Sequence, residues 1–192
     1  MARPRSFDTE QVLDQATDVF WRKGFAATTP QDLCEATGLG PGSLYNAFDG
    51  KRQLFDRVLE RYNQRGAAAQ LAILDEPKPV RERIRGLLMA TMSNSPIGVS
   101  RTGCLAVNTA VQLAGTDPEL AELLRKRFGE TENALVAAIE YGQACGEIRT
   151  DVAARALGRM VLSTMYGMTV LATTFDDPEQ LADVLEASIA VL

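Results

Sequence analysis

The chain repeatedly places a proline directly after a residue that can cap a helix, and this feature constrains its fold more than any other. The pattern occurs at Thr29-Pro30, Gly40-Pro41, Asp117-Pro118 and Asp177-Pro178. Proline suits the first position of a helix because its missing N–H would have no partner there. Apolar residues recur at helical spacing between these starts, and no strand-like alternation of useful length interrupts them. We therefore predict an all-α chain of about nine helices. Gly24 is expected to close the first helix, the fourth is expected to run from Lys51 to about Leu74, and Thr150 or Asp151 is expected to start the eighth.

Residues 29–48 are predicted to form two short helices joined by a tight turn. Thr29-Pro30 starts the first helix, and Gly38 ends it with the positive φ that glycine tolerates. Gly40-Pro41 starts the second helix, which ends at Asp49-Gly50. Two short helices around a glycine turn are typical of a helix-turn-helix.

The second of these helices has two contrasting faces. Leu44 and Phe48 are expected to pack against Leu33 and Ala36 of the preceding helix. The outer face then carries small or hydrogen-bonding residues, which suit a helix lying in the major groove of DNA: Pro41, Gly42, Ser43, Tyr45 and Asn46. The alternative is an ordinary helical hairpin with a polar exposed face.

The net charge of −5 argues against nucleic-acid binding at first sight. The charge is uneven, however. Residues 1–65 hold nine basic and nine acidic residues, so the whole negative surplus lies in residues 66–192. Local cations can therefore give the first part a positive face: Arg3, Arg5, Arg22, Lys23, Lys51 and Arg52. Arg3 and Arg5 precede the first helix and could reach a minor groove, although a frayed basic tail would look the same in sequence.

Residues 8–66 resemble the DNA-binding domain of the TetR family of bacterial transcriptional repressors. The strongest signal combines Leu44-Tyr45 with Phe48 and a lysine three residues later, Lys51. The other resembling positions are Ala16, Phe20, Gly24-Phe25, Thr28-Thr29, residues 33–38, residues 40–43 and Leu54-Phe55. The resemblance covers the first third of the chain, and the rest matches the family only in its helical layout.

The resemblance implies a three-helix helix-turn-helix DNA-binding domain in residues 1–66 and a helical ligand-binding and dimerisation domain in residues 67–192. It implies that Thr28 or Thr29 contacts phosphate and that Lys51 holds the DNA backbone. The family often has lysine where Pro41 stands, so base reading by side chains is expected to be thin here. Helix N-termini, whose amides bind anions, would carry more of the phosphate contact.

The last two predicted helices carry more apolar surface than one core requires. A helix that is apolar all round must be buried on two sides, and the second side would face another subunit. We therefore predict a homodimer whose interface includes Met168, Leu181, Leu185 and Ile189. Burial of these helices within one chain is the alternative.

A ligand pocket is predicted in the middle of the second domain. Its expected residues are mostly adaptable or amphipathic, with one amide to orient a ligand: Met89, Met92, Cys104, Asn108, Tyr141, Met165 and Tyr166. The effector is expected to be largely apolar, because an unpaired buried charge is costly. Arg101, Arg155 or Arg159 could still pair a weak carboxylic acid, and plain core packing is the alternative for each pocket residue.

Cys104 is a candidate reactive thiol. It follows Gly103 at a predicted helix start, three residues after Arg101. A helix N-terminus and a nearby cation both favour the thiolate, and some TetR-like regulators sense electrophiles through cysteine. The alternative is a small buried apolar residue.

Several function classes are disfavoured by what the sequence lacks. It contains no histidine, which excludes Ser-His-Asp and Cys-His catalysis and histidine-ligated metal sites. The three cysteines are far apart, so neither a disulfide framework nor a zinc cluster is indicated. No cofactor is expected. No apolar run approaches the roughly 20 residues of a membrane helix, which favours the cytoplasm.

We therefore predict a repressor that is released from a palindromic DNA operator by a small-molecule effector. One rival is a helical small-molecule-binding protein whose helix-turn-helix is vestigial, and salt-dependent DNA binding would exclude it. Another is a thiol-based electrophile sensor acting through Cys104. An enzyme is the least favoured class, because no matched acid–base pair is present.

Overall fold

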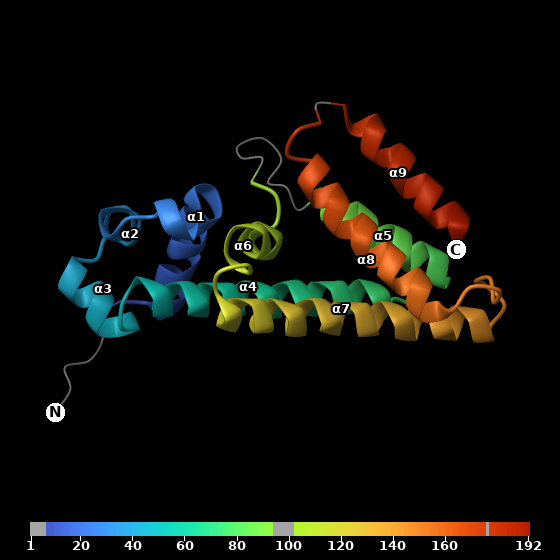
Figure 1. Cartoon of the computed structure of the whole chain (residues 1–192), viewed down its shortest axis with the longest axis horizontal. Coiled ribbons are helices and arrows are strands. Elements are labelled where there is room, and N and C mark those ends of the chain that lie inside the picture. Colours follow the sequence, from blue (N-terminus) through green and yellow to red (C-terminus); the bar gives the residue numbers. More distant parts are fainter. Residues whose placement is uncertain (1–6, 94–101, 176) are drawn as a thin grey trace. The chain divides into compact units, whose positions relative to one another are not determined.

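The computed structural model describes residues 7–93, 102–175 and 177–192. This described part is all-α, as predicted, and contains nine helices and no strand (Figure 1). Their bounds are α1 Thr9–Ala27, α2 Pro30–Thr37, α3 Pro41–Phe48, α4 Lys51–Leu74, α5 Val80–Ser93, α6 Leu105–Leu113, α7 Pro118–Ala144, α8 Ala154–Leu171 and α9 Pro178–Val191. The chain divides into two compact units, Met1–Gln64 and Arg65–Leu192.

The first unit is built around aromatic side chains from both ends of its sequence. The ring centroid of Phe55, on α4, lies 4.9 Å from that of Phe20, on α1, and 4.9 Å from that of Phe25. Gly24 interrupts α1 with a φ of 75° and ends its regular part, as the sequence predicted. This break lets the chain turn into α2 while Phe20 and Phe25 both reach the core.

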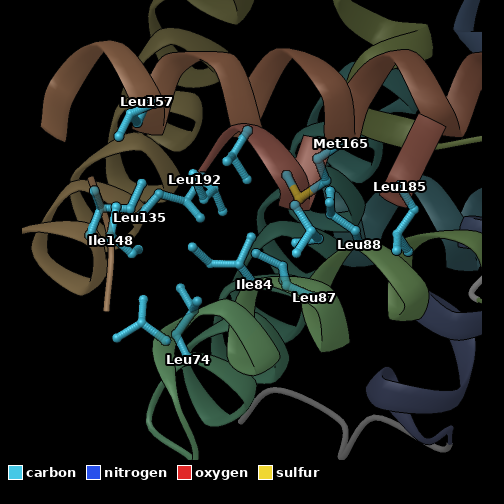
Figure 2. Close-up of a cluster of buried hydrophobic side chains, with 14 of the residues drawn as sticks. Leu74, Ile84, Leu87, Leu88, Leu135, Ile148, Leu157, Met165, Leu185 and Leu192 are labelled. Carbon is cyan, nitrogen blue, oxygen red and sulfur yellow. The ribbon is translucent and has the colours of Figure 1, made fainter. Parts of the chain in front are cut away.

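The second unit has one apolar core shared by α5, α7, α8 and α9. Figure 2 shows residues of this cluster, with Ile84, Leu87 and Leu88 of α5 gathered near Met165 of α8. Helices α7 and α8 cross closely at Gly158, where an added Cβ would lie 2.9 Å from Cγ2 of Val136. Gly158 is therefore the position that permits this crossing.

The start of α8 corrects a sequence prediction. Thr150 or Asp151 was expected to begin this helix, but it begins at Ala154. The carboxylate of Asp151 instead pairs with the guanidinium of Arg149, at 2.5 Å. The side-chain amide of Gln143 donates to the carbonyls of Arg149 and Val152, which fixes this segment in a non-helical path.

The four predicted interface residues belong to the core of their own chain. Met168, Leu181, Leu185 and Ile189 are at most 7% exposed, and all pack in the cluster of the second unit. The prediction that their side chains form the dimer face is therefore wrong. Periodicity located an apolar stripe correctly, but neighbouring helices of the same chain cover it.

Within the described residues, no helix combines the length and the apolar character needed to cross a membrane.

Candidate nucleic-acid interface and ligand site

Helix α2 begins with a complete capping box. The hydroxyl of Thr29 accepts a hydrogen bond from the backbone N–H of Asp32, at 3.2 Å, and the Asp32 carboxylate accepts one from the N–H of Thr29, at 2.9 Å. Lys23 on α1 donates to the same carboxylate at 2.6 Å. These contacts, led by Lys23, lower the pKa of Asp32 from its ordinary 3.8 to about 2. The carboxylate thus fixes the start of α2 to α1.

A glycine turn sets the angle between α2 and α3. Gly38 caps α2 in the left-handed region, with a φ of 68°, as predicted. Gly40 then precedes Pro41 and supplies no side-chain cap for α3. Leu44, Ala47 and Phe48 form the buried face of α3. The remaining face of this helix points away from the core.

This outer face consists of the residues that the sequence singled out. Pro41, Gly42, Ser43 and Asn46 are exposed, and Tyr45 is half-buried. A Cβ added at Gly42 would meet no atom of the chain within 4 Å, so packing within the protein does not require a glycine there. Near its N-terminal end this face has no side chain at Gly42, and its exposed side chains can contact another molecule.

The interface carries little charge of its own. Helices α2 and α3 contain no lysine or arginine, and α2 contains Asp32 and Glu35. Lys51 begins α4 beside the end of α3, with its Nζ 4.5 Å from the ring centroid of Phe25. Burial lowers the pKa of Lys51 below its ordinary value. Lys51 is thus held in place by an aromatic ring, at the start of a helix.

The two threonines before α2 differ in what they can contact. Thr29 is exposed, whereas Thr28 is only 1% exposed and its hydroxyl donates to the Gly24 carbonyl at 2.7 Å. Of the two side chains, that of Thr29 therefore stays the candidate for the phosphate contact, since the Thr28 hydroxyl closes the break in α1. Arg3 and Arg5, the predicted minor-groove arm, lie outside the described residues.

Two family models match the chain. The model for bacterial regulatory proteins of the tetR family matches residues 12–58, and the model for the tetracyclin repressor-like C-terminal domain matches residues 75–188. The chain belongs to the TetR family. This family consists of DNA-binding regulators rather than enzymes, and the chain is accordingly a DNA-binding transcriptional regulator.

Known TetR relatives match over most of their length. The chain is 31% identical to the HTH-type transcriptional regulator YezE of Bacillus subtilis, with 100% of both chains covered. It is 32% identical to the transcriptional repressor ComR of Escherichia coli, over 88% of this chain and 81% of that protein. A cysteine-substituted form of the TetR regulator CifR, solved with a 26-base-pair operator, superposes with a TM-score of 0.86 at 28% identity, covering 98% of each chain.

Three predicted ligand residues lie in one part of the second unit. Met165 is buried in the core, Tyr166 is half-buried with its ring centroid 4.9 Å from that of Phe128, and Cys104 is the partly exposed N-cap residue of α6. Burial raises the pKa of Tyr166 above its ordinary value, and nearby Cys104 adds a smaller contribution in the same direction. Asn108 instead secures its own helix start, because its side-chain amide donates to the Thr102 carbonyl at 2.7 Å.

Two other predicted pocket residues face outward. The side chains of Met89 and Tyr141 are 51% and 57% exposed, so they do not form walls of an enclosed pocket in this chain. The ring of Tyr141 lies 5.5 Å from the guanidinium of Arg83. Each belongs to an amphipathic helix whose core face is occupied by neighbouring aliphatic residues. The side chain of Met92 lies outside the described residues.

The arginines expected to meet an acidic ligand are placed elsewhere. Arg155 and Arg159 on α8 both contact the carboxylate of Glu132 on α7, at 2.8 and 3.0 Å, on the surface. Arg101 lies outside the described residues. Another arginine, which the sequence analysis did not single out, occupies the interior.

That residue is Arg127, which is only 8% exposed, with Thr131 one turn further along α7. Both lie on the same stripe of α7 as Leu120, Leu124 and Leu135, which are buried. A charged residue on such a stripe is a detectable signal in sequence, because arginine is rarely fully buried without a partner. The acidic residues of this helix, Glu130, Glu132 and Glu140, indicate in the sequence only a solvated face.

Proposed function

We propose that this regulator is a cytoplasmic repressor that binds a palindromic operator as a homodimer and is released by a small-molecule effector in its second unit. The outer face of α3 carries the proposal. It is exposed, it follows a glycine-capped turn, and its polar groups are those of Ser43, Tyr45 and Asn46. Such a helix can enter a major groove and donate or accept hydrogen bonds at base edges.

Glycine and proline at the start of α3 support a close approach to DNA. Gly42 offers no side chain, so the backbone can come nearer to a phosphate or a base than any other residue would allow. No side chain caps the start of α3, so its first amides present the positive end of the helix dipole, whereas the capping box already engages the amides of Thr29 and Asp32 at α2. With few cations on these helices, we expect a shallow salt dependence of binding compared with regulators that have a basic recognition helix.

The proposal is tested by replacing Tyr45 and Lys51 with alanine. Both variants should bind a selected operator more weakly than the parent, as measured by fluorescence anisotropy, while circular dichroism stays unchanged. Loss of a phosphate contact at Lys51 should also lower the salt slope by about one. Lys126→Ala, an exposed lysine on α7, is the matched control and should bind like the parent. Parent-like binding by both test variants would refute this assignment of the face.

Dimerisation is proposed through the exposed face of α8. A single helix-turn-helix reads too few base pairs for useful specificity, and two copies related by two-fold symmetry solve this problem. Because the apolar stripe of α8 is covered within the chain, the partner would meet the opposite face, which carries Ser163, Gly167 and Val170. Val170 is an exposed large hydrophobic side chain, with 48% of its surface accessible.

The dimer face is tested by a pair of valine substitutions. Val170→Glu should shift the protein from dimer to monomer in sedimentation experiments and weaken operator binding. Val111→Glu, on α6, changes an even more exposed valine and should leave the dimer intact. A parent protein that sediments as a folded monomer at micromolar concentration contradicts the proposal.

Electrophile sensing through Cys104 is a second candidate. The partly exposed thiol at the N-cap of α6 favours it, because such a position is reachable and faces the positive end of a helix. Cys104→Ser should abolish release of DNA by N-ethylmaleimide, whereas Cys145→Ser, at an exposed thiol, should not. Unchanged release in the Cys104 variant excludes the thiol mechanism.

A further inference from the structure

Arg127 holds a buried positive charge whose neighbours are neutral. Its Nη1 donates to the Thr131 hydroxyl at 2.8 Å, and its Nη2 donates to the side-chain carbonyl of Gln70, on α4, at 2.8 Å. The Thr131 hydroxyl also lies 3.3 Å from the same Gln70 oxygen. Within the described part of the chain, no aspartate or glutamate forms an ion pair with Arg127. The guanidinium is therefore positioned by hydrogen bonds and not neutralised.

This arrangement differs from that of three surface arginines in the second unit. Arg155 and Arg159 share Glu132, Arg149 pairs with Asp151, and all three are on the surface, where solvent already screens their charge. Arg127 is the more deeply buried group. A guanidinium with so little exposed surface and no carboxylate beside it offers a site that an anion from outside the chain can occupy.

The guanidinium has hydrogen-bonding capacity to spare. It carries five N–H donors, and the contacts to Thr131 and Gln70 engage one on each Nη, which leaves three without a partner among the described residues. Its Nε makes no hydrogen bond to a described residue. In the described chain, the fully buried polar atoms that lack a hydrogen-bond partner all belong to Arg61 and Asn63, so the Nε of Arg127 is not fully buried. We infer that solvent, and hence a ligand atom, reaches this side of Arg127.

The surroundings of Arg127 suit an organic anion better than an inorganic one. Tyr166 lies beside the Arg127–Thr131 pair, and its ring packs on that of Phe128. Burial raises the pKa of Tyr166, so its phenol stays protonated and able to donate a hydrogen bond. Aromatic rings beside a single cation match a ligand with one negative charge and an apolar body. A phosphate dianion would leave one of its charges unpaired.

We propose that Arg127, oriented by Thr131 and Gln70 and flanked by Tyr166, binds the carboxylate of an effector whose remainder is aromatic or aliphatic. This inference rests on the proposed ligand-responsive function and assigns it a ligand class. It narrows the expectation of a largely apolar effector to a weak carboxylic acid, because the cation that a carboxylate needs is already present in the interior. The planar guanidinium matches a carboxylate in shape and can bind it through two hydrogen bonds.

The test compares acids with amides of the same shape. Benzoate and octanoate, with benzamide and octanamide as uncharged matches, are titrated into the parent, Arg127→Met and Arg125→Met. Arg125 is an exposed arginine on the same helix and serves as the control. Melting temperature is measured at constant ionic strength with chloride as the reference anion, and operator affinity is measured in parallel.

We expect at least one acid to raise the melting temperature of the parent and of Arg125→Met, with little effect of its amide. Arg127→Met should bind that acid about 10-fold or more weakly, because a hydrogen-bonded charge pair is lost. Because Arg127→Met also loses the hydrogen bonds to Thr131 and Gln70, the shift that each acid causes is measured against the same variant without ligand. Equal shifts by the acids in the parent and in Arg127→Met would overturn the proposal.

The two readouts separate this inference from the function on which it rests. If an acid stabilises the protein through Arg127 but leaves operator affinity unchanged, the anion site stands and ligand-driven release fails. If acids and amides release DNA equally, ligand-driven release stands and the anion site fails. Release by the acid alone should lower operator affinity by about 5–150-fold.

Discussion

Replacing Gly158 by alanine tests the helix crossing on which the second unit depends. The new Cβ would lie 2.9 Å from Cγ2 of Val136 and 3.4 Å from its backbone nitrogen. Real carbon contacts are longer than the first of these distances, so one helix must shift. Val136 cannot swing away easily, because a β-branched side chain in a helix has one strongly preferred χ1.

The size of the effect follows from two opposing contributions. Overpacking a well-filled interior costs about 1–3 kcal/mol. Exchanging glycine for alanine inside a helix returns about 1 kcal/mol. Gly129 on α7 provides the control, since a Cβ there would meet nothing within 4 Å. Gly129→Ala gains only the higher helix propensity of alanine. The two variants should therefore differ in unfolding free energy by about the overpacking cost, 1–3 kcal/mol.

Thermal unfolding measures this difference directly. For a chain of this size, 1 kcal/mol moves Tm by about 2–4 °C, so Gly158→Ala should melt at least about 2 °C below Gly129→Ala. The control should melt at or above the parent. If Gly158→Ala were as stable as Gly129→Ala, the close approach of α7 and α8 at Val136 would be wrong.

Three further predictions concern the cap, the recognition helix and the core. Because the pKa of Asp32 is lowered in the folded protein, its ionised form stabilises the protein above about pH 4, and this stabilisation is lost as the pH falls from 3.8 towards 2. Asp32→Asn should be less stable than the parent at neutral pH and lose less stability across that pH range. Parallel acid-unfolding curves for the two proteins would contradict this. Gly42→Ala should melt no lower than the parent yet bind operator more weakly, and unaltered affinity would show that the α3 backbone does not approach DNA closely. Leu185→Ala should cost about 2–5 kcal/mol of stability, because this side chain is buried in its own chain. If this variant instead loses the dimer with an unchanged Tm, Leu185 belongs to the dimer interface.

Local chemistry determined most helix ends and is visible in sequence. Thr29-Pro30 and Gly38 delimit α2, and α4 runs from Lys51 to Leu74, as predicted. Where the sequence prediction failed, at the start of α8, the decisive contacts came from elsewhere: Gln143 on α7 bonds to the preceding carbonyls. A capping pattern indicates that a segment can start a helix, and tertiary contacts decide whether a helix starts there.

The outer face of α3 could be predicted because a short helix with one clear apolar face leaves little choice about the other. The sequence could not show which of Thr28 and Thr29 is exposed, because the burial of two adjacent residues at a helix start depends on the direction in which the chain turns. Periodicity also cannot say which partner covers an apolar stripe. For Leu185 and Ile189 that partner is their own chain.

Arg127 was missed for a different reason. Sequence patterns treat a charged residue on a long helix as solvated by default, and α7 carries many such residues. Only the position of Arg127 in register with Leu120, Leu124 and Leu135 marks it as internal.

The central claim, that α3 of two symmetry-related copies reads DNA, is tested most directly by selecting binding sites from a library of random duplexes with the full-length protein. The account predicts enrichment of a palindrome whose half-sites lie about one helical turn, or a multiple of it, apart. It also predicts that Asn46→Ala relaxes the preference at a symmetrical pair of positions. Failure to enrich any sequence, or enrichment of a single asymmetric site that Asn46→Ala leaves unchanged, would contradict the account.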